Sequence, residues 1–423
     1  MLVVRNVRAL EILDSRGNPT VSVTVELSDG TQATAQVPSG ASTGKHEAVE
    51  LRDGDPSRYA GKGVLRAVAN VNDVLGPAIR GRGVEDQAAL DHRLIEIDGT
   101  PDKSRLGANA LLGISCACAR SVAQSRRVPL WQSLPSGQTP KMPVPMVNII
   151  SGGLHAGSRI EVQDFLVIPH GFPDLAAALE GIVKVHRAAE GVLLEREYTL
   201  TGVADEGGWG PALESNQEAL DILADAIART GLDDHFSIAL DIAASHFHQD
   251  GRYHLKTENR TLTAAEMIQL LSDWTSNYPI TSIEDGLEED DWHGWRALTK
   301  KLGSRVQLVG DDLFTTNPER VRYGINIGAA NAVLVKMNQI GTLTETFEVV
   351  RRAREAGYSA VISARSGETE DSLLADLAVA CGTGQIKIGS VTRSERLSKY
   401  NRLLEIDRDF ISGLTSKEQH GRQ

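Results

Sequence analysis

The second half of the chain repeats one pattern, in which a short apolar run ends at a charged residue. Ala332-Val333-Leu334-Val335 leads directly to Lys336, with no polar alternation before the lysine. A run of this kind is typical of a strand buried on both faces, as in a parallel sheet. A lysine does not easily stay buried and charged, so Lys336 either reaches water or lies in a cleft among carboxylates.

Five further segments end in the same way. Their charged residues are Asp241, Glu284, Asp311, Arg365 and Lys387, and successive members of the set of six are between 22 and 43 residues apart. One strand, one helix and two loops take roughly this length, which indicates a series of βα units. Charged residues at the carboxyl ends of parallel strands are where a (β/α)8 barrel carries its chemistry. The sequence therefore predicts that the six residues share one site.

The N-terminal part has a different pattern. Apolar and polar residues alternate over 21–27, and Ser28-Asp29-Gly30 predicts a hairpin turn into a second strand over 31–37. Residues 64–75 and 106–127 have the apolar spacing of helices. Small hydroxyl and glycine residues over 38–44 form either a linker or a mobile loop that closes over an anion or metal.

The segment Pro135-Ser136-Gly137-Gln138-Thr139-Pro140 indicates an interdomain linker. We therefore predict an N-terminal α+β capping domain over 1–136 and an α/β barrel domain over 143–423. After Leu404 the chain turns polar, and a frayed end is expected.

Composition narrows the class of protein. The 423 residues are 41% hydrophobic and 24% charged, as in ordinary globular proteins. A net charge of −12 argues against a nucleic-acid or anionic-membrane partner but leaves room for a small anionic substrate. The three cysteines, Cys116, Cys118 and Cys381, are too few for a disulfide framework, so reduced core residues are expected. With no signal peptide and no apolar run of transmembrane length, a cytoplasmic protein is expected.

The predicted site has a definite chemistry. Asp241, Glu284 and Asp311 would repel one another in a closed cavity unless a hard cation such as Mg²⁺ bound them. Lys336 beside a metal and the second cation, Lys387, should have a lowered pKa that suits a base. Arg365 and Ser366 suit a phosphate or similar oxyanion. The set therefore suits removal of a proton beside a carboxylate, with Mg²⁺ neutralising the charge that develops.

From about residue 3 to about 405 the chain also resembles the enolase family. The segments that carry the resemblance are Glu11-Ile12-Leu13-Asp14-Ser15-Arg16-Gly17-Asn18-Pro19-Thr20, Ser39-Gly40-Ala41-Ser42-Thr43-Gly44, Ser282-Ile283-Glu284-Asp285, Gly310-Asp311-Asp312-Leu313, Lys336-Met337-Asn338-Gln339-Ile340-Gly341-Thr342 and Arg365-Ser366-Gly367-Glu368-Thr369-Glu370-Asp371. The resemblance implies an α+β cap on a barrel whose second strand is antiparallel, and a homodimer or larger homo-oligomer. It also implies elimination of water from 2-phosphoglycerate with two Mg²⁺ ions.

Carried over by position, the resemblance assigns roles to individual residues. It makes Lys336 the base and gives the phosphoryl group to Arg365 and Ser366. Lys387 is expected at the substrate carboxylate. The resemblance also implies that the first metal is bound by Asp241, Glu284 and Asp311, and that Ser42 contacts the second metal and the substrate. It implies that Glu206 and Asp164 are catalytic residues on the side of the site that protonates the leaving hydroxide. It implies substrate contacts for His155 and Gln163.

The chain departs from the family pattern around this site. Asp164 stands where enolases have glutamate in Gln-Glu-Phe, and Ala364 stands where they have histidine in Ser-His-Arg-Ser. Further changes are Ser151 in place of the asparagine of Asn-Gly-Gly, Gly286-Leu287 in place of Pro-Phe after Glu-Asp, and His246 in place of the glutamate of Ala-Ala-Ser-Glu-Phe. The metal ligands and the base are kept, whereas the residues that expel hydroxide are altered.

Three hypotheses follow. The first is an enolase relative that makes an enolpyruvate ester on a substrate unlike 2-phosphoglycerate. Enolase relatives in phosphinate antibiotic pathways form carboxyphosphonoenolpyruvate, in which a carboxyl replaces one phosphoryl oxygen, and Ala364 leaves room for it. Two reactions fit this product. One is dehydration of the corresponding glycerate, and the other is attack of an enolate on an activated phosphonoformate. The altered residues on the acid side favour the second reaction. The alternatives are an ordinary glycolytic enolase and an inactive relative that acts as a binding or scaffold protein.

Overall fold

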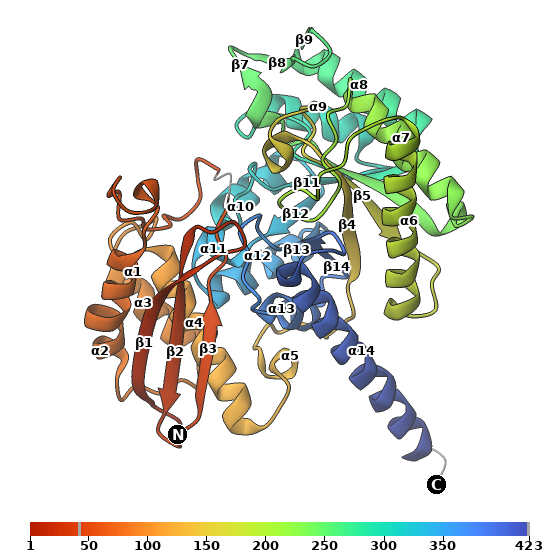
Figure 1. Cartoon of the computed structure of the whole chain (residues 1–423). Helices are drawn as coiled ribbons and strands as arrows, with labels where there is room; N and C mark the ends of the chain where they lie inside the picture. The colour runs from red at the N-terminus through yellow and green to blue at the C-terminus, as the bar shows by residue number, and fades with distance from the viewer. Residues whose placement is uncertain (41–43, 421–423) are drawn as a thin grey trace.

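The computed structural model describes residues 1–40 and 44–420, with side chains described through residue 410. A small sheet with its helices forms one body, and a closed barrel with surrounding helices forms the other (Figure 1). The last helix, α14 (Ser394–His420), extends away from the barrel and ends near the C-terminus. The chain is therefore helical well past Leu404, and the last residues, for which fraying is expected, include 421–423, which lie outside the described residues. Buried Ile406 and the Arg402–Asp376 ion pair anchor this part of the helix on the barrel domain.

The first domain is built on an antiparallel sheet in the order β1-β2-β3, with bounds β1 (Val4–Leu13), β2 (Pro19–Leu27) and β3 (Gln32–Gln36). Its helical segments are η1 (Tyr59–Gly61), α1 (Leu65–Ala69), the π-helical η2 (Asn70–Leu75), α2 (Gly76–Ile79), α3 (Gln87–Asp98), α4 (Ala108–Arg126) and α5 (Leu130–Ser133). The predicted hairpin is confirmed, and α4 matches the predicted second helix within two residues. The inward residues of β2, which the alternation identified, are fully buried.

Eight strands close the barrel of the second domain: β4 (Val144–Ser151), β5 (Asp164–Pro169), β6 (Phe236–Asp241), β10 (Ile280–Glu284), β11 (Gln307–Gly310), β12 (Ala332–Val335), β13 (Ser359–Ser363) and β14 (Gln385–Gly389). Strand β5 pairs antiparallel with both β4 and β6, and the other neighbouring pairs are parallel. The prediction of a barrel whose second strand is antiparallel is therefore confirmed.

Helices cover the outside of the barrel, and short elements complete its loops. The helices are α6 (Leu175–Glu195), α7 (Asn216–Arg229), α8 (Ala264–Asn277), α9 (Trp292–Leu302), α10 (Pro318–Ile327), α11 (Met337–Ile340), α12 (Leu343–Glu355), α13 (Leu373–Cys381) and α14. The short elements are η3 (Gly153–Ala156), η4 (Asp233–His235), η5 (Ala244–Phe247), β7 (His248–Gln249), β8 (Arg252–Leu255) and β9 (Arg260–Leu262). Within the described residues, no helix combines the length and apolarity that crossing a membrane requires.

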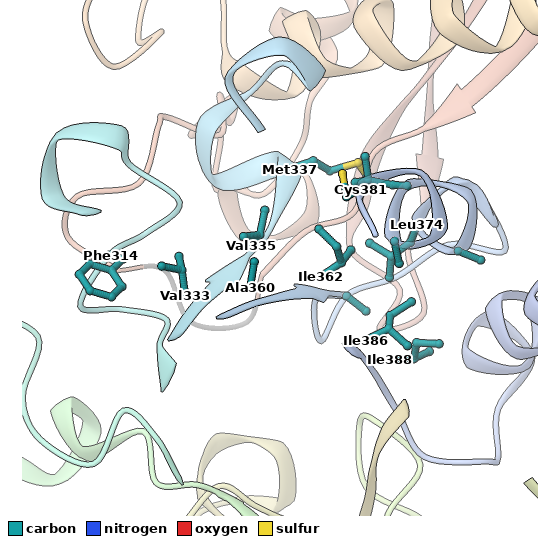
Figure 2. Close-up of a cluster of buried hydrophobic side chains, with 14 of the residues drawn as sticks. Phe314, Val333, Val335, Met337, Ala360, Ile362, Leu374, Cys381, Ile386 and Ile388 are labelled. Carbon is teal, nitrogen blue, oxygen red and sulfur yellow. The ribbon is translucent and has the colours of Figure 1, made fainter. Parts of the chain in front are cut away.

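Two apolar clusters lie on opposite sides of the barrel wall. Figure 2 shows Ile362 of β13 beside Leu374 of α13, whereas Val333 of β12 lies beside Phe314. A separate cluster is made by Met146, Leu166, Ile168, Ala239, Val309, Ala332, Leu334 and Val361. Side chains alternate along a strand, so Val333 and Leu334 belong to opposite faces and the second cluster fills the barrel interior. The same alternation places the residue two positions beyond an interior residue on the interior side.

A buried ion pair joins the two domains. Arg120 of α4 donates to both carboxylate oxygens of Asp371, at 2.9 Å and 2.6 Å, and the backbone N–H of Gln36 donates to the same carboxylate at 2.9 Å. Burial alone would raise the pKa of Asp371, but Arg120 and the backbone donors outweigh it and hold the pKa below its ordinary value. The carboxylate is therefore charged at neutral pH and depends on Arg120.

We expect Arg120→Ala to lower the free energy of unfolding by about 3 kcal/mol, the lower end for removing one partner of a buried pair, because Arg120 retains some contact with water. Urea denaturation measures this change. Arg126→Ala is the matched control, because Arg126 lies on the same helix and its ion pair with Glu85 is exposed, at 43% and 41%. Its loss should cost less than about 1 kcal/mol. Equal losses in the two variants would contradict a special role for the Arg120–Asp371 pair.

Candidate active site

The charged residues predicted at strand ends lie around one rim of the barrel. Asp241 is the last residue of β6 and Glu284 the last of β10, and these two strands are neighbours. Asp311 and Lys336 directly follow β11 and β12. Asp241, Asp311 and Lys336 each stand two positions beyond an interior residue of the apolar cluster, namely Ala239, Val309 and Leu334. The apolar cluster therefore lies below the charged layer, with its side chains filling the barrel beneath the mouth.

The reversed strand β5 brings a further pair of residues to the same rim. Asp164 is its first residue and is in register with Asp241 on β6 and Ser151 on β4. Gln163, directly before it, donates a hydrogen bond from Nε2 to Asp241 Oδ2 at 3.1 Å. An ordinary parallel strand would carry its first residue at the opposite end of the barrel, so the antiparallel direction is what places Gln163 and Asp164 in the site.

Lys387 lies between two of the predicted metal ligands. Its Nζ is 2.7 Å from Asp241 Oδ2 and 2.7 Å from Glu284 Oε2. All three side chains are buried, which alone would lower the pKa of the lysine, but the two carboxylates outweigh burial and raise that pKa well above its ordinary value. The ammonium therefore compensates the charge of two acids that could not otherwise share this space.

Lys336 forms the second ion pair of the mouth. Its Nζ donates to Asp311 Oδ2, and Gln339 Nε2 donates to Asp311 Oδ1 at 2.9 Å. Burial and nearby Arg365 favour a lowered pKa for Lys336, but the Asp311 carboxylate outweighs them and raises it. The lowered pKa that the sequence predicts is for a lysine beside a bound metal, and it stays a prediction. A lowered pKa of Lys336 requires that another cation bind Asp311.

The donor set fits Mg²⁺. Asp241, Glu284 and Asp311 offer only carboxylate oxygens, which is the chemistry that Mg²⁺ prefers and zinc does not require. Asp285 and Asp312 lie beside this set, because one oxygen from each lies within 4.8 Å of an Asp311 oxygen and of the other. Burial and the neighbouring acids raise the pKa of Asp285 well above its ordinary value and that of Asp312 to about 8. A bound Mg²⁺ would compete with Lys387 and Lys336 for the same carboxylates and would take over their charge compensation.

The acid side of the site is organised around His155. Its Nδ1 is 3.1 Å from Asp164 Oδ2, and its Nε2 is 3.7 Å from Glu206 Oε1. Burial alone would lower the pKa of His155, but the Asp164 and Glu206 carboxylates outweigh it and raise the pKa to about 9. His155 therefore carries a positive charge at neutral pH and separates the two acids that flank it.

Asp164 is held by three donors. The Asn148 amide donates to Asp164 Oδ1 at 2.5 Å, and the Ser151 hydroxyl lies 3.3 Å from the same oxygen. Together with His155, these contacts occupy both carboxylate oxygens of a side chain that is fully buried. Asp164 is thus part of a fixed network behind His155.

Glu206 is positioned through its backbone. Its carbonyl accepts a hydrogen bond from the Ser390 N–H at 2.8 Å. The next carbonyl, of Gly207, accepts from His186 Nε2 at 3.2 Å and from the Thr392 hydroxyl at 2.7 Å. Gly207 has a φ of 91°, and a Cβ there would lie 2.5 Å from the Thr392 hydroxyl oxygen. The glycine therefore permits the turn that directs the Glu206 carboxylate toward His155.

Arg365 is buried against a residue of the capping domain. Its Nη1 lies 3.0 Å from Glu47 Oε2, and Glu47 also accepts from Gln339 Nε2 at 3.3 Å. Arg396 of α14, fully buried, donates to the Arg365 carbonyl at 2.6 Å and to the Ser366 carbonyl at 2.6 Å. The predicted anion clamp thus has a fixed backbone and an acidic counter-ion, which an incoming anion would have to replace.

Several residues around the rim have strained backbone. Ala243, Asp285, Thr315 and Thr316 have φ values of 48°, 43°, 47° and 51°, in the left-handed region that branched residues seldom adopt. Thr316 uses this conformation, because its hydroxyl accepts from the Lys336 N–H at 2.9 Å and donates to Gln339 Oε1 at 2.6 Å. The strained turn therefore fixes the backbone beneath the predicted base.

The structure brings together Lys336, Lys387, Asp241, Glu284, Asp311, Gln163, Asp164, His155, Glu206, Arg365 and Ser366, as the sequence predicts. Ser42, the predicted second-metal ligand, lies outside the described residues. Sequence reasoning missed Glu47, Gln339 and Arg396. Gln339 lies in the segment from Lys336 to Thr342 that resembles the enolase family, so the sequence could have identified it. Glu47 and Arg396 reach the site from elements that are remote in sequence.

We expect His155 to remain cationic up to about pH 9, because its neighbouring carboxylates stabilise the charged ring. Its folding contribution should be present below its unfolded pKa, about 6.5, and should be lost as the pH rises through about 9. Nitrogen-15 NMR of the histidine rings measures the pKa, with His155→Gln identifying the signal. His186, whose pKa is lowered by burial, is the internal control and should be neutral at pH 7. A His155 ring that titrates near pH 6.5 would contradict this network.

We expect Asp311→Asn to lose most of the Mg²⁺ affinity, because the amide keeps the shape of the side chain but removes one negative charge from the donor set. Titration calorimetry measures the affinity. Asp290→Asn is the matched control, since Asp290 lies at the rim and pairs with Arg320 and His46 instead. Unchanged affinity in Asp311→Asn would remove this residue from the metal site.

Comparison with known families agrees with this geometry over nearly the whole chain. Residues 4–134 match the family model described as the enolase N-terminal domain. Residues 139–421 match the model described as the enolase C-terminal TIM barrel domain. Together the two matches cover both bodies of the structure and the rim that carries the charged residues. The chain belongs to the enolase family.

Proposed function

We propose that this enolase-family enzyme forms carboxyphosphonoenolpyruvate, an enolpyruvate ester whose phosphorus carries a carboxyl group. The observation that carries the proposal is the state of Asp164. The carboxylate is fully buried and held by Asn148, Ser151 and His155, so it is not free to protonate a leaving hydroxide. The proposed base Lys336 and the proposed metal ligands Asp241, Glu284 and Asp311 lie together at the same rim. A reaction that needs a base and a metal but no hydroxide departure fits these two facts.

The base side acts on a carbon beside a carboxylate. Mg²⁺, when bound by Asp241, Glu284 and Asp311, supplies the positive charge that stabilises the developing enolate. Once Asp311 no longer pairs with Lys336, burial and Arg365 lower the pKa of the lysine, which suits it to accept a proton. Lys387, released from the carboxylates that it bridges, is placed to hold the substrate carboxylate.

The second substrate would be an activated phosphonoformate, with a leaving group on phosphorus. Lys336 takes a proton from the methyl carbon of pyruvate, and the resulting enolate oxygen forms a bond to phosphorus. The bond from phosphorus to the leaving-group oxygen breaks, and that oxygen keeps the electron pair. The bond between phosphorus and the carboxyl carbon is untouched. No hydroxide leaves in this sequence.

Space beside Arg365 supports a larger substituent on phosphorus. A cavity of about 410 Å³ on the capping-domain side is lined by residues that include Arg16, Glu47 and Asn338. Arg16 Nη1 lies 3.4 Å from the Ser366 hydroxyl, so the cavity borders the predicted phosphorus-binding residues. A carboxyl on phosphorus is the substituent that we propose for this region.

We expect the purified protein with Mg²⁺ to convert pyruvate and a nucleotidyl phosphonoformate, labelled with ¹³C in the carboxyl, into a product with enol CH₂ signals. Phosphorus-31 NMR should show a new doublet, because the bond between phosphorus and the labelled carbon is retained. Conversion of 2-phosphoglycerate should be about 10²–10⁴-fold slower than in an ordinary enolase, the usual effect of losing a positioned proton donor. Absorbance of the enol product follows the second reaction.

The double variant Asp164→Glu with Ala364→His is the matched test of the same residues. It should recover part of the 2-phosphoglycerate activity and lose the reaction with phosphonoformate, since it restores the family side chains and fills the space. An unmodified protein that turns over 2-phosphoglycerate at an ordinary enolase rate, with no new phosphorus doublet, would show that the proposal is wrong and that the protein is a glycolytic enolase.

A further inference from the structure

A basic cavity lies on the capping domain, bounded by the end of α2, the loop that follows it and α3. Its volume is about 750 Å³, within the range of about 300–1,000 Å³ that is usual for small-molecule sites. No residue that lines it belongs to the mouth of the barrel. Its charged lining residues are Arg80, Arg82, Arg93 and Glu96, and His92 lines it as well. Three arginines therefore share this lining with a single acid.

The arginines of the basic cavity are only partly paired within the protein. Among the described residues, the Arg82 side chain makes no hydrogen bond or ion pair, and Arg80 makes only a hydrogen bond to Asn6 Oδ1 at 3.5 Å. Arg93 Nη1 pairs with Glu96 Oε2 at 3.2 Å, but the buried Arg93 Nε has no acceptor in the described part of the chain. A donor without an acceptor costs free energy when it is buried. A bound anion would give these guanidinium groups the acceptors that the protein does not provide.

The backbone on both sides of the basic cavity is fixed. The Arg82 carbonyl accepts a hydrogen bond from the Val4 N–H of β1 at 2.9 Å, and the Gly81 N–H donates to the Val4 carbonyl at 2.8 Å. On the other side, Asp91 of α3 accepts from the N–H of Thr344 at 2.9 Å and from its hydroxyl at 2.6 Å, which holds α3 on the barrel domain. Binding an anion would therefore order side chains without having to order the backbone that carries them.

We propose that the basic cavity binds a small molecule that carries two or more adjacent phosphoryl groups. The planar N–H pairs of a guanidinium match phosphoryl oxygens, and three guanidinium groups offer more donors than one phosphoryl group can use. The protein as a whole has a net charge of −12, so the attraction is local to this lining. The apolar lining residues Ala78, Ala89 and Leu90 leave room for the remainder of such a molecule. The inference does not rest on the proposed function.

Titration calorimetry of the whole chain with inorganic pyrophosphate tests the site, and inorganic phosphate is the comparison. Mg²⁺ is omitted so that no metal holds pyrophosphate at the mouth. Pyrophosphate should bind about 10-fold more tightly than phosphate, because it engages a second guanidinium group, and Arg82→Gln or Arg93→Gln should weaken its binding about 10-fold. Arg66→Gln is the matched control, since Arg66 is exposed on α1, does not line the basic cavity and carries the same charge.

Glu96→Gln tests the site in the opposite direction. It removes the acid of the lining and releases Arg93 from its ion pair, so it should strengthen pyrophosphate binding about 3-fold, as expected for one exposed charge. Loss of structure does not produce such a gain. Equal affinities in Arg82→Gln and Arg66→Gln would show binding at the mouth or an adventitious ion only, and would overturn the inference. Equal binding of phosphate and pyrophosphate, or an unchanged affinity in Glu96→Gln, would overturn it as well.

Discussion

The mouth of the barrel depends on compensation of buried charge. Asp241, Glu284 and Asp311 lie on three consecutive strands, and such carboxylates can be buried together only if cations pair with them. In this structure Lys387 compensates two of them and Lys336 compensates the third. The same carboxylates are the proposed ligands of Mg²⁺, so metal binding would exchange one set of cations for another. That exchange would leave both lysines for the substrate, so the same residues would set the stability of the mouth and its chemistry.

Much of this arrangement could be predicted because a strand has a period of two. An apolar run that ends at a charged residue fixes which face that residue takes, and the spacing of the runs fixes the order of the strands. The interior cluster below Asp241, Asp311 and Lys336 follows directly from that pattern. The strained turn at Thr315 and Thr316 does not, because its conformation is imposed by contacts with Lys336 and Gln339 rather than by local preference. The sequence also does not show that Asp311 is the ion-pair partner that raises the pKa of Lys336 in this arrangement.

The capping domain contributes to the site through contacts that no spacing along the chain reveals. Glu47 pairs with Arg365, and Lys45 pairs with Glu289, so the segment after the glycine-rich loop is attached to the barrel at two points. In both contacts a charged side chain of the capping domain pairs with a charged side chain at the mouth of the barrel. The ion pair between Arg120 and Asp371 joins the domains at a distance from these points. An anion that displaced Glu47 from Arg365 would therefore act on the joint between the domains as well as on the clamp.

On the acid side, Asp164 differs from the glutamate of the family pattern in its contacts as well as in its length. At position 164 the aspartate carboxylate lies close to its own strand, where Asn148 and Ser151 of the neighbouring strand reach it. Ser151 is itself a departure from the family pattern, so two changed residues contact each other and form one network. The network holds His155 through Nδ1 and leaves Nε2 toward Glu206. A cationic His155 in that place stabilises negative charge on a substrate but is a poor donor to a departing hydroxide, because its own pKa is raised. The acid side is therefore better suited to binding an anion than to expelling one, which is the physical reason for preferring transfer to phosphorus over dehydration.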